Sequence, residues 1–203
     1  MLYYMWYAKY VKDKESMLSE KKFGVISLGC DKNRMDTEKL LGLITARGYT
    51  LTDDIAAAQI LIVNTCAFLE SARQEGIETI LECAEQRKGG NLEKLVVTGC
   101  LPQKFIDELF EPLQEADVFL GINDYEKIFE ALENSYTQGA RQNYVGKGKD
   151  GYLRNRVQTT ADHFAYLKIA DGCYNRCTYC LIPKIRGKYR SYPMEDLLRE
   201  ARE

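Results

Sequence analysis

The sequence predicts an α/β fold built on a mainly parallel sheet. From Phe23 to about residue 135, short apolar runs alternate with longer stretches in which apolar residues recur at helical spacing. Glycines follow the first two helical stretches, at Gly48 and at the Gly89–Gly90 pair, where glycine commonly stops a helix. Consecutive βα units therefore account for the pattern across residues 23–135.

Four strands and four helices are expected in this stretch. The strands are the apolar runs at 23–28, 59–63, 94–98 and 117–121. The helices are expected at 33–47, 69–87, 103–113 and 125–133.

The remainder of the chain divides into three parts. Residues 1–22 form an extension, in which translation from Met17 would give a more ordinary start than Met1. Residues 136–163 are polar and contain several glycines, which predicts a linker or an irregular hairpin. In 164–203, a strand at 164–170 leads into a loop with three cysteines, and a helix is expected over 193–203, with Pro193 near its first turn.

Composition places the chain among cytoplasmic proteins without membrane contact. No apolar run reaches the length of a membrane span, and no secretory signal pattern opens the sequence. The net charge of −2 does not indicate a nucleic-acid-binding protein. Basic residues concentrate near the end, at Lys184, Arg186, Lys188 and Arg190. They indicate either a solvated basic turn or a role near a cofactor or an acidic target.

Seven cysteines in such a protein favour metal ligation or redox chemistry over disulfides. Three of them, Cys30, Cys66 and Cys100, each come directly after a predicted strand. Because the carboxyl ends of parallel strands meet at one edge of the sheet, these thiols predict a shared metal site. The alternative is that each is a small buried apolar residue, which is the interpretation adopted for Cys83 in mid-helix. The single His163 is expected at the surface.

The second group of thiols, Cys173, Cys177 and Cys180, has Cys-x3-Cys-x2-Cys spacing. A 4Fe–4S cluster needs four ligands, so three thiolates in one loop would leave one iron open. The alternative is zinc, but a structural zinc site requires four closed ligands and this loop has three.

At this loop the sequence resembles the radical SAM superfamily, and the resemblance implies the first strand of a (β/α) barrel. It further implies that Cys173, Cys177 and Cys180 bind a 4Fe–4S cluster whose open iron holds S-adenosylmethionine. Reductive cleavage of that cofactor then gives a radical that abstracts hydrogen from an unactivated carbon. Tyr179 fits an aromatic contact to the adenine, with a place in the core as the alternative.

When the Cys173–Cys180 loop is considered together with the three upstream thiols, the sequence is similar to the methylthiotransferase family. That resemblance implies a second 4Fe–4S cluster on Cys30, Cys66 and Cys100. Four stretches resemble the branch of this family called RimO: GCDKNRMD (29–36), NTCAFLESARQEGIETI (64–80), GCLPQKF (99–105) and LGINDYEKI (120–128). The resemblance implies that this chain is an amino-terminal part of such a protein. Tyr192 departs from the family, which usually has Arg there.

The RimO resemblance implies insertion of a methylthio group at the β-carbon of an aspartate in small-subunit ribosomal protein twelve. It also implies an electron donor such as flavodoxin or ferredoxin. Two alternatives remain, a tRNA adenosine methylthiotransferase and a non-enzymatic cysteine-rich metal-binding module. Because a (β/α) barrel takes roughly 250 residues and 164–203 would supply only its start, these 203 residues alone are expected to be inactive.

Overall fold

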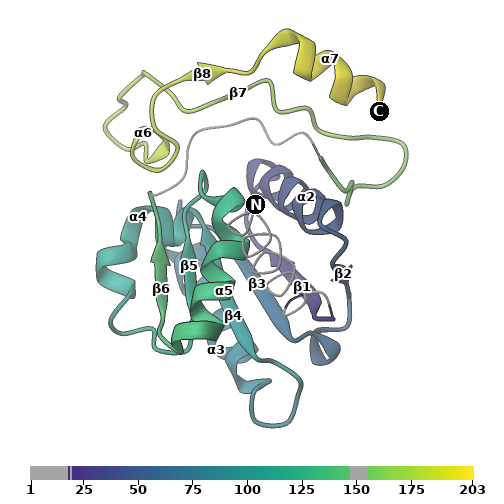
Figure 1. Cartoon of the computed structure of the whole chain (residues 1–203). Coiled ribbons are helices and arrows are strands. Elements are labelled where there is room, and N and C mark those ends of the chain that lie inside the picture. Colours follow the sequence, from purple (N-terminus) through teal and green to yellow (C-terminus); the bar gives the residue numbers. More distant parts are fainter. Residues whose placement is uncertain (1–17, 19, 147–154) are drawn as a thin grey trace, which may run out of the picture.

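A parallel sheet with strand order β2-β1-β3-β4-β5-β6 forms the centre of the molecule (Figure 1). The computed structural model describes Leu18, residues 20–146 and residues 155–203, so both possible start residues lie outside the described ranges. The strands are β1 (Lys22–Ser27), β2 (Thr50–Leu51), β3 (Ile60–Thr65), β4 (Lys94–Gly99), β5 (Val118–Leu120) and β6 (Gln142–Tyr144). This arrangement confirms the α/β prediction.

Two hydrophobic cores cover the two faces of the sheet, because successive side chains of a strand point to opposite faces. Ile60 and Ile62 of β3 join one core with helices α2 (Asp31–Ala46) and α5 (Ile128–Gln138). Leu61 and Val63 join the other with helices α3 (Glu70–Glu85) and α4 (Cys100–Leu109). Every residue of β3 is buried, which explains its continuous apolar run.

The connections include two short 3₁₀ turns, Ile55–Ala57 and Tyr125–Lys127. Among the helices that the structure describes, none combines the length and the apolar character needed to cross a membrane.

Residues 155–203 arch over the edge of the sheet where β1, β3 and β4 end (Figure 1). They contain the short antiparallel pair β7 (Ala170–Asp171) and β8 (Arg190–Ser191), followed by helix α7 (Met194–Arg202). Between the two strands lies the one-turn helix α6 (Ile182–Ile185). Ile185 is buried in the same core as α3 and α4, so this segment packs on the sheet domain.

One expectation about the second half is wrong. The strand expected at 164–170 is present only at Ala170, because β8 pairs with Ala170 and Asp171 alone among the described residues. Within the part of the chain that the structure describes, residues 164–169 have no ladder partner, and several of their apolar side chains, such as Ile169, are exposed. The sheet also includes β6, which lies beyond residue 135, the expected end of the first domain.

Helix α2 and the returning chain approach each other closely at Gly42. A Cβ atom at this position would lie 2.5 Å from the backbone nitrogen of Arg156. No side chain fits there without a shift of the backbone. Gly42 therefore allows residues 155–156 to pack directly on the helix.

We expect Gly42→Ala to lower the free energy of unfolding and to displace residues 155–160 from α2. Overpacking costs about 1–3 kcal/mol, which exceeds the gain of up to about 1 kcal/mol from the better helix propensity of alanine. Urea unfolding and hydrogen exchange at 155–160 measure the two effects. Gly89→Ala is the matched control, because nothing lies within 4 Å of a Cβ there. Equal stability of the two variants would contradict the close approach.

Candidate cysteine sites

The three strand-end cysteines lie at the carboxyl ends of β1, β3 and β4, which are neighbours in the sheet. Cys30 directly precedes α2, Cys66 directly follows β3, and Cys100 is the first residue of α4. The strand order reverses between β1 and β3, where open parallel sheets form a binding crevice. The structure thus brings these residues to one edge, as the sequence predicts.

Glycines beside two of the cysteines permit the close approach of the strand ends. Gly29 has φ +91°, and a Cβ there would lie 2.7 Å from the Cβ of Cys66 and 3.1 Å from its Sγ. Gly99 has φ +99°, and a Cβ there would lie 2.6 Å from the backbone nitrogen of Thr65. Both positions combine a backbone conformation that favours glycine with a lack of space for a side chain.

The three thiols differ in exposure. Cys30 is exposed, whereas Cys66 and Cys100 are 9% and 8% exposed. Burial raises the pKa of Cys100 to about 11, and the guanidinium of Arg186 opposes that shift. The carboxylate of Asp36 raises the same pKa further, and Cys66 and Cys30 act in the same direction, as expected if both lie near Cys100.

Asn33 joins the beginning of α2 to the ends of β1 and β3. Its Nδ2 donates to the carbonyl oxygens of Leu28 (2.8 Å) and Thr65 (3.1 Å), and its carbonyl oxygen accepts from Nδ2 of Asn64 (3.0 Å). Its Oδ1 lies 3.9 Å from the Sγ of Cys100. Sequence reasoning assigned no role in the site to Asn33, although a polar residue in the first turn after Cys30 was a usable signal.

Asn33→Ala is expected to destabilise the chain by about 1–3 kcal/mol, because it leaves buried carbonyl groups without their donor. Chemical unfolding measures the loss. The control is Asn91→Ala, since Nδ2 of Asn91 makes a comparable 3.0 Å bond to the Ala56 carbonyl in an exposed position. If both variants lose the same stability, Asn33 does not anchor the strand ends.

The second cysteine group lies in the loop between β7 and α6. Cys177 is exposed, and Cys173 and Cys180 are half-buried. The backbone N–H of Asn175 donates to Sγ of Cys173 (3.4 Å), and the N–H of Cys180 donates to the carbonyl of Cys177 (3.0 Å). The loop is anchored at its base, where the N–H of Cys173 donates to the Gly187 carbonyl (3.1 Å).

Neither cysteine group is drawn together into a closed metal-binding geometry. Across residues 18, 20–146 and 155–203, no three or more His, Cys, Asp or Glu side chains are arranged to hold a metal ion. The structure places the cysteines of each group in one region of the fold. Metal binding by these cysteines stays a prediction. Cys83 is buried in the α3–α4 core and His163 is exposed, as expected. Tyr179 is 82% exposed, so its alternative place in the core is wrong.

A buried cluster of four charged residues connects the two cysteine groups. Lys168 Nζ lies 2.7 Å from Asp36 Oδ1 and 2.6 Å from Asp171 Oδ2. Arg186 Nη2 lies 2.8 Å from Asp36 Oδ2, and its Nη1 lies 3.0 Å from Asp171 Oδ2. Although burial acts in the opposite direction, Lys168 and Arg186 lower the pKa of Asp171 to about 2. The cluster therefore holds the Asp171 carboxylate ionised.

The interpretation of the basic residues as a solvated turn is wrong for Arg186, which is 4% exposed. Arg190 is half-buried and donates from Nη2 to Oδ1 of Asn123 (3.0 Å). Lys184 and Lys188 are exposed. The two arginines face the sheet domain because they pack on it, whereas the two lysines face solvent.

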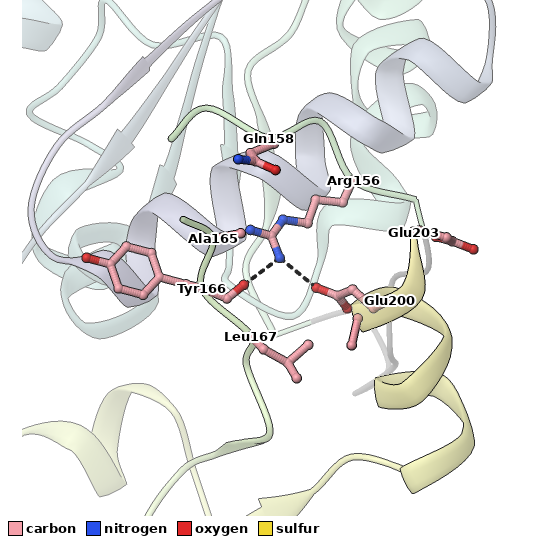
Figure 2. A pocket seen from close by; sticks show the side chains of 8 residues that line it. Arg156, Gln158, Ala165, Tyr166, Leu167, Glu200 and Glu203 are labelled. Atoms are coloured by element: carbon pink, nitrogen blue, oxygen red, sulfur yellow. Dashed lines mark hydrogen bonds and ion pairs between the residues drawn. The ribbon is translucent and has the colours of Figure 1, made fainter. Parts of the chain in front are cut away.

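Arg156 makes a second charged contact between the halves, and Figure 2 shows its interactions with Glu200 and with the carbonyl of Tyr166. Its Nε donates to Glu38 of α2 (2.7 Å), and its Nη1 donates to Glu200 of α7 (2.9 Å) and to the carbonyl of Tyr166 (2.5 Å). Glu38 also accepts from the N–H of Thr159 (2.7 Å). A groove of about 440 Å³ lies beside this contact, lined by Arg156, Gln158, Ala165, Tyr166, Leu167, Glu200, Ala201 and Glu203.

Comparison with known proteins identifies the family. Residues 22–121 match the model of the uncharacterized protein family UPF0004. Curated relatives named ribosomal protein uS12 methylthiotransferase RimO match most of the chain. The protein from Clostridium tetani is 49% identical over 89% of this chain and 40% of its own length. The protein from Lachnoclostridium phytofermentans is 48% identical over 89% of this chain and 41% of its own length. The protein from Trichlorobacter lovleyi is 43% identical over 92% of this chain and 42% of its own length.

The chain is similar to these RimO proteins over most of its length. The UPF0004 match contains all three cysteines of the first site, and the match to the RimO relatives covers about nine-tenths of the chain. The family expected from the sequence motifs is thereby confirmed. The chain spans about two fifths of the length of the RimO relatives that it matches.

Proposed function

We propose that this chain is the amino-terminal part of a radical SAM methylthiotransferase that inserts a methylthio group at the β-carbon of an aspartate in ribosomal protein uS12. The observation that carries the proposal is the presence of two separate three-cysteine groups in a chain similar to the RimO proteins. The buried charge cluster between the groups supports their action in one site.

The two cysteine groups would each hold a 4Fe–4S cluster. Cys30, Cys66 and Cys100 supply three thiols at one sheet edge, and the Cys173–Cys180 loop supplies three more. Three thiolates fit a cluster with one open iron. When bound, the second cluster together with S-adenosylmethionine supplies the one-electron chemistry that hydrogen abstraction from an unactivated carbon requires.

The residues around each group have distinct roles in this proposal. The buried surroundings of Cys66 and Cys100 shield the first group from water, while the exposed Cys30 leaves one side open. The exposed ring of Tyr179, beside Cys180, would contact the adenine of S-adenosylmethionine. A flavodoxin or a ferredoxin would supply the electron in the cytoplasm. Residues 164–203 would form the start of the radical SAM barrel.

A chimera tests the function. The matching 182 residues of the Clostridium tetani protein are replaced by those of this chain, and the chimera is assayed with uS12 and with tRNA. We expect methylthio-aspartate in uS12 by mass spectrometry and unmodified tRNA. The same chimera with Cys177→Ala is the inactive control. Modification of tRNA alone would establish the adenosine alternative instead.

A further inference from the structure

Arg186 connects the segment that follows the second cysteine loop with the first cysteine site. It lies directly after α6, and its Nη2 donates toward the Sγ of Cys100 at 3.9 Å. Both side chains are almost fully buried. A guanidinium remains charged in such surroundings, so the sulfur atom of Cys100 has a fixed positive neighbour.

The position of the guanidinium is determined by two carboxylates. Asp171 holds Nη1 at 3.0 Å and Asp36 holds Nη2 at 2.8 Å. Asp171 precedes the second cysteine loop, and Asp36 lies in the helix that follows Cys30. Parts of both cysteine sites therefore orient the same side chain.

A purely structural role would be to join the two carboxylates. Lys168 already does this, because its Nζ lies within 2.7 Å of an oxygen of each. Arg186 differs in that its Nη2 also reaches the Cys100 sulfur atom, at 3.9 Å. The planar guanidinium can bind both carboxylates and still direct an N–H toward sulfur, which an ammonium group with one nitrogen cannot do in the same way.

We propose that Arg186 is a positioning residue for the first cysteine site: it donates a hydrogen bond to the Cys100 sulfur atom and stabilises the reduced state of a cluster bound there. This inference rests on the proposed function, since it needs a cluster on Cys30, Cys66 and Cys100. A positive charge and an N–H···S bond both favour the more negative reduced cluster, and hydrogen bonds to sulfur are known to tune cluster potentials.

The test isolates the first cluster. The 203-residue chain with Cys173, Cys177 and Cys180 all replaced by Ala is reconstituted anaerobically and compared with the same chain carrying R186M or R186K. We expect R186M to shift the midpoint potential of the cluster to more negative values, and R186K to restore part of the shift. In chain labelled with ¹⁵N-arginine, pulsed electron paramagnetic resonance of the reduced cluster should show a nitrogen coupling that R186K abolishes.

Lys168→Met is the control for a general effect of the charge cluster. It removes a cation from the same two carboxylates without touching Cys100, so it should leave the potential and the ¹⁵N coupling close to those of the parent. A Lys168→Met shift as large as that of R186M would overturn the inference, and so would a ¹⁵N coupling that is absent in the parent or unchanged in R186K. The coupling measurement decides the matter even if R186M does not fold. Failure of the parent to bind a cluster would instead overturn the proposed function.

Discussion

Replacement of Cys173, Cys177 and Cys180 with Ala is expected to remove about half of the iron from the anaerobically reconstituted chain. The unmodified chain should hold roughly eight irons, because two four-iron clusters are proposed. The three cysteines lie in one loop between β7 and α6, so their loss should leave the first site at the sheet edge intact. Iron and sulfide analysis per chain, with visible absorbance, measures the result.

Replacement of Cys30, Cys66 and Cys100 should remove the other half. Cys83→Ala is the control, since Cys83 packs in the α3–α4 core and should leave the iron content unchanged. An unchanged iron content in the Cys173–Cys180 variant would contradict its ligand role. About one zinc per chain, without charge-transfer absorbance, would establish the non-enzymatic metal-binding module.

Asp36→Ala is expected to lower the free energy of unfolding by about 3–5 kcal/mol, which is the usual cost of breaking a buried ion pair. Without this carboxylate, Lys168 and Arg186 share Asp171 alone, and one buried positive charge loses its partner. The segment from 155 onward should then detach from α2. Urea unfolding gives the free energy, and limited proteolysis reports on cleavage within 155–203.

Lys88→Ala is the control for Asp36→Ala. Lys88 pairs with Glu85 on the surface of the molecule, where both side chains are exposed. Exposed ion pairs contribute at most about 1 kcal/mol. A loss after Asp36→Ala that is no larger than the loss after Lys88→Ala would show that the charge cluster does not hold the two halves together.

The sequence carried a strong signal for the sheet and for the first cysteine site. The apolar runs 60–63 of β3 and 95–97 of β4 are continuous because both faces of these strands are covered by helices. Their parallel register, with Ile60 opposite Lys94, places Cys66 and Cys100 at the same level. The position of a cysteine directly after a buried strand was therefore enough to predict the shared edge.

The connection between the two cysteine groups could not be predicted in the same way. Asp36 and Lys168 are 132 residues apart, and their charges made both resemble ordinary surface residues. Arg186 belonged to a basic cluster for which the sequence favoured neither a solvated nor a buried position. The strand at 164–170 had β-forming residues, but a strand needs a ladder partner, and in this stretch only Ala170 pairs with another residue that the structure describes.

The long separations within the charge cluster also imply an order of folding. The contacts among the strand ends join residues about one βα unit apart, such as Asn33 and Thr65, whereas Arg186 reaches back 86 residues to Cys100. Contacts between distant residues form late because closing a long loop costs more entropy. During synthesis, the sheet can fold before the residues beyond 155 are available. We therefore expect all three thiols of the first site to be accessible to cluster-loading partners until the Arg186 segment packs against Cys100.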